Sequence, residues 1–315
     1  MTHNVVIICY RMEASRLPGK PLAVIEGETL LQHVVERYGT SSRVDSVLVA
    51  IPSGEADDGL ARLCKHLGVP CHRGSNEDVV SRMNGAILKY APEATAVFRG
   101  LGDMPLVDIP LLDWRFDLLA RHGADVLWCG QADDLWPVYG SRESPWSRKA
   151  WDGIFKNSIG LEREHVGQWL YSNLARFAVV HTEMLSDEYY RPYRLELDSA
   201  ADLAFFRAIF DALYKGPGTP TTLEALRWLD EHPEVAALNS SIPTKTLTQV
   251  EWEKRRGSMW RCDECGSFPL HADVVKTVHR GDKTFRRLET KCPRCNKVRK
   301  FYESAPQEDQ WLEIP

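Results

Sequence analysis

Residues 4–20 read NVVIICYRMEASRLPGK, and this stretch determines the architecture of the chain. Its first seven residues are almost continuously apolar and rich in β-branched side chains. Such a run is typical of a strand that is covered on both faces in a parallel sheet. Three cations and a Pro-Gly turn follow directly, and loops at the carboxyl ends of parallel strands are where open α/β sheets bind ligands. The stretch therefore predicts a binding loop for an anionic ligand.

The cations of this loop are Arg11, Arg16 and Lys20. A guanidinium fork and an ammonium point charge complement phosphate oxygens in different ways. We therefore interpret Arg11, Ser15, Arg16 and Lys20 as a triphosphate-binding loop. The alternative is a solvated basic loop, and the clustering of three cations with Pro-Gly in ten residues favours the phosphate interpretation.

Strands and helices are predicted to alternate from this loop onward, as in βαβ units. The dinucleotide fingerprint G-x-G-x-x-G is absent after the first strand, which argues against an NAD-type site. We expect an α/β fold with a Rossmann-like, mostly parallel sheet. Apolar runs predict strands at 46–52, 95–99 and 173–181, and helical periodicity predicts helices at 29–40, 56–67, 77–90, 200–213 and 222–231.

Asp103 follows the strand predicted at 95–99, within Gly100-Leu101-Gly102-Asp103-Met104-Pro105. It should therefore stand at the same edge of the sheet as Lys20. Magnesium prefers oxygen ligands and usually binds through one or two carboxylates together with substrate phosphates. We interpret Asp103 as the first metal ligand; the alternative is an aspartate that caps a turn.

The cysteines and the charge set the end of the chain apart. Two C-x2-C pairs, Cys262/Cys265 and Cys292/Cys295, predict a structural Zn²⁺ site with four thiolates. Residues 251–301 carry a net charge of +7, whereas residues 1–250 carry −8. We expect a catalytic domain at 1–239, a linker at 240–256, a zinc ribbon with a hairpin near 274–283 within 257–302, and an acidic tail at 303–315.

No run approaches the roughly 20 apolar residues that span a bilayer, and we expect a cytoplasmic protein without a membrane partner.

The loop motif at 11–22, Gly27-Glu28-Thr29-Leu30-Leu31 and the segment 33–37 together resemble the opening of the sugar-acid cytidylyltransferases. The resemblance extends over about residues 4–239 and is strongest to the spore-coat polysaccharide branch, which is related to the 3-deoxy-manno-octulosonate enzymes. It departs from the usual pattern at Cys9-Tyr10. The zinc ribbon is not typical of this family. The resemblance implies a nucleotidyltransferase domain that acts on CTP.

The resemblance also implies further site residues. Asp198, in a strand-to-helix segment, matches a second Mg²⁺ ligand, although it could instead cap the helix that begins near Ser199. Asp202 is expected to be a first-turn or surface charge. We assign Ser75, at a helix N-terminus, and Arg99, beside the Asp103 turn, to the nucleotide or substrate anion. The candidate substrate contacts are Arg73, Arg82, Arg163 and His165; for the arginines on helices an ion-paired role, and for His165 a surface role, is the alternative.

We therefore expect a Mg²⁺-dependent cytidylyltransferase that transfers CMP from CTP to an acidic sugar, or to a phosphate or phosphonate acceptor, and releases pyrophosphate. The choice of cytosine rests on the resemblance. One alternative is a nucleotide-sugar glycosyltransferase, although Asp103-Met104-Pro105 lacks the second carboxylate of an Asp-x-Asp motif. Another is a nucleic-acid-binding or scaffold protein that acts through the ribbon. We expect a homodimer, and nucleic acid is the less favoured partner.

Overall fold

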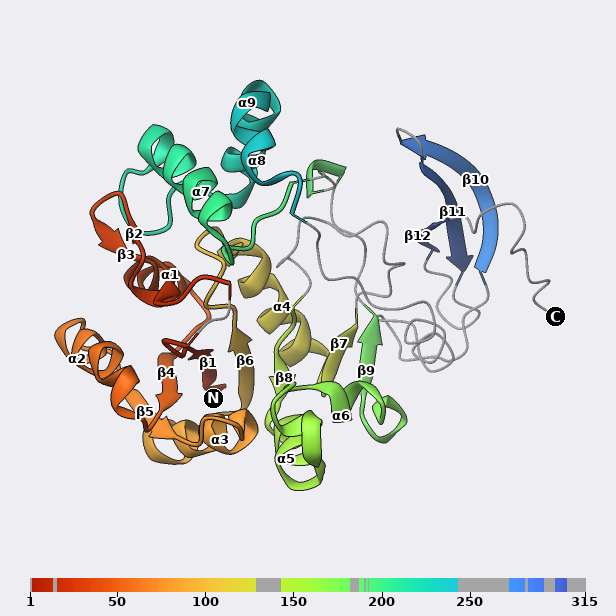
Figure 1. Cartoon of the computed structure of the whole chain (residues 1–315). Coiled ribbons are helices and arrows are strands. Elements are labelled where there is room, and N and C mark those ends of the chain that lie inside the picture. Colours follow the sequence, from red (N-terminus) through yellow and green to blue (C-terminus); the bar gives the residue numbers. More distant parts are fainter. Residues whose placement is uncertain are drawn as a thin grey trace.

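The computed structural model describes residues 2–13, 16–128, 143–181, 187–189, 191 and 193–242, together with three strands between residues 272 and 304. In the first 242 residues seven described strands form a mixed sheet in the order β5-β4-β1-β6-β8-β7-β9 (Figure 1), and β2 (Val24–Ile25) pairs with β3 (Glu28–Thr29) in a separate two-stranded sheet. All neighbouring strands of the mixed sheet are parallel except at β8, which is antiparallel to β6 and to β7. The strands of the mixed sheet are β1 (Asn4–Cys9), β4 (Ser46–Pro52), β5 (Cys71–Gly74), β6 (Ala96–Gly100), β7 (Val126–Trp128), β8 (Trp146–Ser147) and β9 (Val179–His181).

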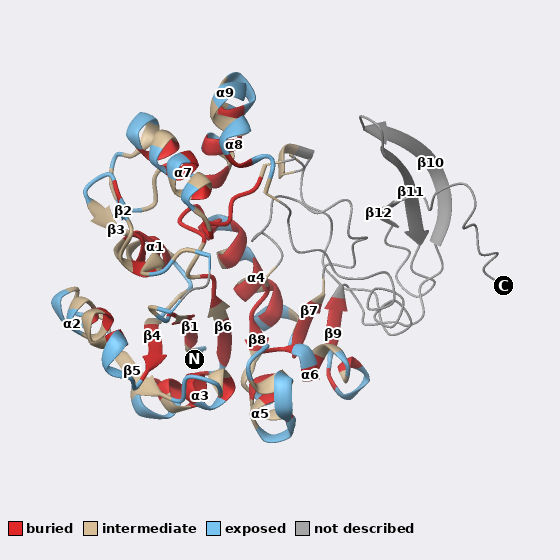
Figure 2. Ribbon diagram, viewed as in Figure 1, coloured by how far each residue is buried: buried red, intermediate tan, exposed pale blue. Residues whose placement is uncertain are grey.

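Two apolar layers cover the sheet, one on each face. In β1, Val6 and Ile8 pack into the core on one side, whereas Val5 and Ile7 pack into the core on the other. This two-sided burial is what the continuous apolar run predicted. In Figure 2 the central strands β1, β4 and β6 are largely buried, whereas β5 at the sheet edge is of intermediate burial. The first core contains α1 (Leu30–Gly39), α2 (Asp58–His66), α4 (Ile109–His122), α7 (Ala200–Leu213) and α8 (Thr222–Glu231); the second contains α3 (Val79–Tyr90), α5 (Arg148–Asn157) and α6 (Gln168–Tyr171).

Local sequence signals account for most helix boundaries. The hydroxyl of Thr29 accepts a hydrogen bond from the backbone N–H of Gln32 and begins α1, as expected. A capping box of Thr221 and Glu224 begins α8. The predicted helices at 200–213 and 222–231 are confirmed. The strand predicted at 173–181 is wrong in its first half, because residues 174–176 form a 3-10 turn.

The chain order creates a switch point between β1 and β6. From β1 the chain builds β4 and then β5 on one side, and α3 carries it back to β6 on the other side of β1. Open α/β sheets bind ligands at such a point, outside the carboxyl ends of the strands. The loop with Arg11, Arg16 and Lys20 follows β1, and Asp103 follows β6, so the topology places both at this crevice.

The described strands beyond residue 271 form a separate antiparallel sheet in the order β10-β11-β12. The expected hairpin is confirmed, since β10 (Ala272–Arg280) pairs with β11 (Lys283–Lys291), and β11 also pairs with β12 (Val298–Ser304). The four cysteines of the predicted zinc site, Cys262, Cys265, Cys292 and Cys295, lie outside the described residues.

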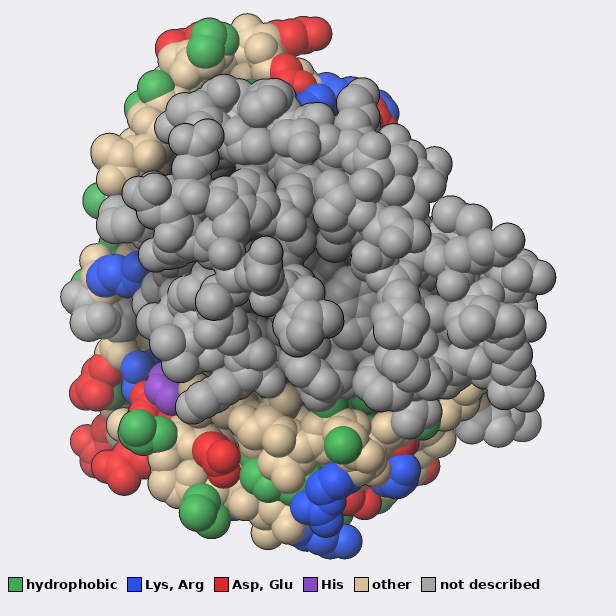
Figure 3. Space-filling view, turned by 90° about the vertical axis from the view of Figure 1, so that its right-hand side faces the viewer, with side chains coloured by type: hydrophobic (Ala, Val, Ile, Leu, Met, Phe, Trp, Pro, Cys, Tyr) green, Lys and Arg blue, Asp and Glu red, His purple; other side chains and the backbone are tan. Residues whose placement is uncertain are grey.

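Charge and hydropathy at the described surface are ordinary. On the face shown in Figure 3, acidic and basic side chains of the described residues lie interspersed with polar and apolar ones. None of the helices in the described part of the chain combines the length and the apolarity that crossing a bilayer requires.

Tyr38 connects this core to the crevice and provides a test of the fold. Its buried hydroxyl accepts a hydrogen bond of 2.9 Å from the backbone N–H of Leu101, in the turn that carries Asp103. Tyr38→Phe leaves that buried donor without a partner, so we expect the free energy of unfolding to fall by about 1–3 kcal/mol in urea denaturation. Tyr193→Phe, which removes an exposed hydrogen bond to Asp230, should cost less than about 0.5 kcal/mol. Equal stability of the two variants would contradict this role of Tyr38.

Candidate active site

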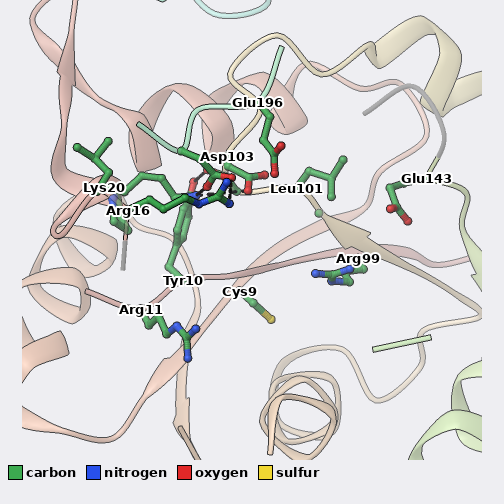
Figure 4. A pocket seen from close by; sticks show the side chains of 15 residues that line it. Cys9, Tyr10, Arg11, Arg16, Lys20, Arg99, Leu101, Asp103, Glu143 and Glu196 are labelled. Atoms are coloured by element: carbon green, nitrogen blue, oxygen red, sulfur yellow. Dashed lines mark hydrogen bonds and ion pairs between the residues drawn. The ribbon is translucent and has the colours of Figure 1, made fainter. Parts of the chain in front are cut away.

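A cavity of about 430 Å³ opens at the switch point (Figure 4). Four segments far apart in the sequence line it: the end of β1 with the loop after it, the end of β6 with the turn after it, the segment before β8, and the segment before α7. Most of the lining side chains are polar or charged. The described lining residues are Cys9, Tyr10, Arg11, Arg16, Leu17, Lys20, Pro21, Arg99, Gly100, Leu101, Gly102, Asp103, Glu143, Glu196 and Asp198.

Lys20 joins the first loop to the turn after β6 and to the segment before α7. Its ammonium lies 2.7 Å from a carboxylate oxygen of Asp198 and 3.3 Å from one of Asp103. Only 14% of the Lys20 side chain is exposed, so its charge needs these partners. Burial alone would lower the pKa of Lys20, but the two carboxylates outweigh it and raise the pKa. Lys20 is therefore a fixed cation at the centre of the site.

Arg16 adds a second cation, because its guanidinium forms an ion pair with the other carboxylate oxygen of Asp198. Burial would raise the pKa of Asp198, but the hydrogen bond from Lys20, the charge of Lys20 and the charge of Arg16 hold it below its usual value. Asp198 is thus an ionised carboxylate between two cations of the β1 loop.

Three carboxylates converge here among the described residues. One oxygen each from Asp103, Glu196 and Asp198 can be chosen so that all lie within 4.8 Å of one another. Burial, together with the negative charges of Asp103 and Asp198, raises the pKa of Glu196. Carboxylate oxygens at this spacing are the donors that Mg²⁺ prefers. The residues present therefore fit a divalent cation.

Glu196 is absent from the sequence-based assignment, although a signal for it exists. In residues 194–198, RLELD, charged residues alternate with Leu195 and Leu197, whose exposed fractions are 1% and 0%. Extended backbone with this alternation places Glu196 on the same face as Asp198. The alternation thus indicates a shared face, but it does not show that Asp103 lies against that face as a further carboxylate.

Backbone hydrogen bonds hold the ligand segments together. The N–H of Leu197 donates to the carbonyl oxygen of Asp103 at 2.8 Å, and the Tyr10 hydroxyl donates to the carbonyl oxygen of Gly102, also at 2.8 Å. A side chain at Gly102 would not fit, because its Cβ would lie 2.6 Å from the Tyr10 ring. The Gly-Asp turn therefore packs directly on the end of β1.

Asp198 does not cap α7. The N-cap residue is Ser199, whose hydroxyl accepts a hydrogen bond from the N–H of Asp202. Asp198 is left with its side chain in the cavity. The expectation of a surface position for Asp202 is wrong, because Asp202 has an exposed fraction of 0% and pairs with Arg194.

The remaining assigned residues fall into two groups. Arg11 and Arg99 line the cavity, whereas Ser15 lies outside the described residues. The others are not among the described lining residues, although Arg82 lies within hydrogen-bonding reach of the lining residue Cys9. Arg73 forms an ion pair with Asp58, and Arg163 forms one with Asp78. Arg82 donates to the carbonyl oxygens of Ser75 and Asn76, and the Ser75 hydroxyl accepts a hydrogen bond from the N–H of Asp78. His165 is exposed in a loop.

Glu143 and Cys9 line the cavity without having been assigned to it. Cys9 stands at the end of β1, and burial raises the pKa of its thiol. Trp146 and Trp151 are fully buried in the core, where their stacked rings lie 6.5 Å apart between centroids.

Comparison with known proteins is consistent with this geometry. A 3-deoxy-manno-octulosonate cytidylyltransferase of Anaeromyxobacter dehalogenans (strain 2CP-1) is 39% identical over 251 residues, covering 73% of this chain and 98% of the relative. The spore coat polysaccharide biosynthesis protein SpsF of Bacillus subtilis (strain 168) is 28% identical over 245 residues, covering 75% and 98%. The solved structure of a cytidylyltransferase from Leptospira borgpetersenii serovar Hardjo-bovis (strain JB197) shares the fold, with a TM-score of 0.66 at 22% identity over 78% of this chain and 100% of that one.

The sequence profile of one family matches residues 5–208, which include the loop after β1, the Asp103 turn and Asp198. The profile describes that family as Cytidylyltransferase. The chain therefore belongs to the cytidylyltransferase family and is a CTP-dependent nucleotidyltransferase.

Proposed function

We propose that this enzyme transfers CMP from CTP to an anionic acceptor, an acidic sugar or a phosphate or phosphonate, in a Mg²⁺-dependent reaction. The observation that carries the proposal is the junction of Lys20 and Arg16 with Asp103, Glu196 and Asp198 at the switch point. The name of the relative from Anaeromyxobacter dehalogenans supports an acidic sugar as the acceptor class. Cations for a triphosphate and carboxylates for a metal are the two halves of a nucleotidyl-transfer site.

In this reaction an acceptor oxygen attacks the α-phosphorus of CTP. The new oxygen–phosphorus bond forms as the bond to the β-phosphate bridge breaks, and pyrophosphate leaves with the electron pair. A hydroxyl acceptor gives its proton to solvent, whereas an anionic phosphate oxygen has none to give. Mg²⁺, held by Asp103, Glu196 and Asp198, would neutralise phosphate charge and orient the reacting groups.

The cations of the β1 loop would bind the triphosphate by exchanging partners. Without nucleotide, Lys20 and Arg16 are paired with the carboxylates. Phosphate oxygens offer them a stronger set of acceptors, and the metal takes over the carboxylates. The cations would then be paired with phosphate oxygens and the carboxylates with the metal ion, so binding leaves no buried charge unpaired. Arg11, at the rim, would add a further phosphate contact.

The acceptor would occupy the opposite end of the cavity. Figure 4 shows Arg99 and Glu143 on the side of the cavity away from Arg16 and Lys20. Arg99 is the cation best placed for an acceptor anion, and Glu143 offers an acceptor for a hydroxyl hydrogen. The roles of Arg73, Arg82, Arg163 and His165 stay predictions. The partners of Arg82 and Arg163 favour support of the α3 and α5 region, whereas the partners of Arg73, Asp58 and Gly54, favour support of the start of α2.

For the end of the chain we propose a zinc ribbon at 257–302, joined to the catalytic domain by the linker at 240–256. Its support is the position of the β10–β11 hairpin between the two C-x2-C pairs. Four thiolates form a closed tetrahedral Zn²⁺ site, which stabilises a small module that has little core of its own.

The catalytic assignment predicts large losses of activity from small changes. Asp103→Asn removes a metal ligand charge, and Lys20→Ala removes a triphosphate contact. Pyrophosphate release from CTP with an acidic-sugar acceptor should fall about 100-fold or more in each variant, with circular dichroism unchanged. Asp230→Asn, which breaks an exposed ion pair with Arg191, should stay within about twofold of the unmodified enzyme. Near-normal rates in Asp103→Asn would refute the assignment.

The ribbon assignment predicts metal content. Full-length protein should carry about one zinc ion per chain by atomic emission spectroscopy, because the site is closed by protein ligands. Cys262→Ser and Cys292→Ser should each lose that zinc. Cys71→Ser, which changes a cysteine of β5 in the catalytic domain, should retain it. Zinc-free wild-type protein, or zinc retained in both ligand variants, would exclude the ribbon.

A further inference from the structure

We propose that Asn239 is a positioning residue for the metal-binding carboxylates, acting through Asp202 and Arg194. The inference rests on the proposed function, because it concerns the metal site of that reaction. Asn239 lies beyond residue 208, where the match to the family profile ends. It closes η7 (Ala237–Asn239), next to α9 (Pro233–Ala236), and Figure 1 shows α7, α8 and α9 grouped together.

Arg194 is the first link between Asn239 and the site. Its guanidinium is 4% exposed and faces three carboxylates. The Nη1 nitrogen lies 2.8 Å from Glu196, Nη2 lies 3.4 Å from Asp198, and Nε lies 3.0 Å from Asp202. A planar fork fixes the relative positions of its partners. Arg194 therefore sets the spacing of Glu196 and Asp198, the two ligands that this segment contributes.

Asp202 is the second link. Its carboxylate is fully buried and accepts hydrogen bonds from the N–H of Asp198 at 3.0 Å and from the hydroxyl of Ser199 at 2.8 Å. Nε of Arg194 and the side-chain amide nitrogen of Asn239 also donate to this carboxylate, so four donors surround it. A buried carboxylate depends on such a set, because each missing donor leaves part of its charge unsatisfied. Asp202 thereby fixes the backbone of Asp198 as well as the fork of Arg194.

Asn239 joins the two ends of this segment. Its side-chain amide nitrogen lies 3.0 Å from the carbonyl oxygen of Arg194 and 3.0 Å from the carboxylate of Asp202. Both neighbours are acceptors only, so the NH₂ group and not the amide oxygen must face them. The residue is 1% exposed, and no water can replace it without rearrangement. Asn239 therefore ties the start of the segment at Arg194 to the first turn of α7, with both metal ligands between.

Loss of this tie should weaken metal binding more than folding. In Asn239→Ala the carbonyl of Arg194 and one acceptor position of Asp202 lose their donor, while every ligand and every charge stays in place. Residues that orient metal ligands typically contribute 10–100-fold to metal affinity. We expect the affinity of the full-length protein for Mn²⁺ in the presence of CTP to fall about tenfold.

The test is Mn²⁺ titration followed by electron paramagnetic resonance of free Mn²⁺, with thermal unfolding measured on the same samples. Asn173→Ala is the matched control, because Asn173 is a partly buried asparagine that donates to the carbonyl oxygen of Trp169, and it does not line the cavity. The proposal expects Asn239→Ala to lose about tenfold in Mn²⁺ affinity and Asn173→Ala to lose less than about twofold. Equal Mn²⁺ affinity in the two variants would overturn it.

A second variant covers the case in which Asn239→Ala does not fold. Asn239→Ser keeps one donor, which can serve only one of the two acceptors, and its Mn²⁺ affinity should lie between those of Asn239→Ala and the unmodified protein. Wild-type affinity in a folded Asn239→Ser variant would also overturn the proposal. Failure of the unmodified protein to bind Mn²⁺ with CTP would instead overturn the proposed function, and this inference with it.

Discussion

The ion pairs between Lys20 and the carboxylates of Asp198 and Asp103 are the interaction on which the rest of the site depends. They join the loop after β1 to the turn after β6 and to the segment before α7. All these groups are largely shielded from water, so removing one charge would leave its partner buried and uncompensated. The requirement that cations and carboxylates meet here restricts how the three segments can be arranged.

The fold meets that requirement through close backbone packing. Gly102 lets the Asp103 turn approach the Tyr10 ring, and the hydrogen bond from Leu197 to the carbonyl oxygen of Asp103 joins the two ligand segments directly. The carboxylates are therefore positioned by backbone as well as by side chains. Such preorganisation holds the carboxylates in place, so that only the side-chain partners of Lys20 and Arg16 would have to change when a nucleotide binds.

The sequence predicted those parts of the molecule that depend on neighbours in the chain. The apolar run of β1, the Thr29 cap and the helices at 200–213 and 222–231 are local features, and the structure confirms them. Lys20 and Asp103 could be assigned to one edge because parallel strands end together, and their meeting in one cavity follows from that topology. Asp198 was assigned from the family resemblance.

The features that were missed depend on partners distant in the sequence. Asp202 looks like a first-turn surface charge until Arg194 and Asn239 are placed around it. Glu196 becomes a ligand candidate only when Asp103 arrives from another strand. The strand predicted at 173–181 fails in part because the chain turns at 174–176 before it joins the sheet edge beside β7. Periodicity carries no information about such tertiary partners.

Calorimetric titration of the full-length protein with CTP, ATP, GTP, UTP and a UDP-sugar, each with Mg²⁺, tests the central claim most directly. Membership of the cytidylyltransferase family predicts that CTP binds at least about tenfold more tightly than the other ligands, a difference of about 1.4 kcal/mol. Asp103→Asn should weaken the binding of CTP, because it removes a carboxylate of the proposed Mg²⁺ site. Tighter binding of the UDP-sugar, or no binding of any nucleotide, would contradict the account.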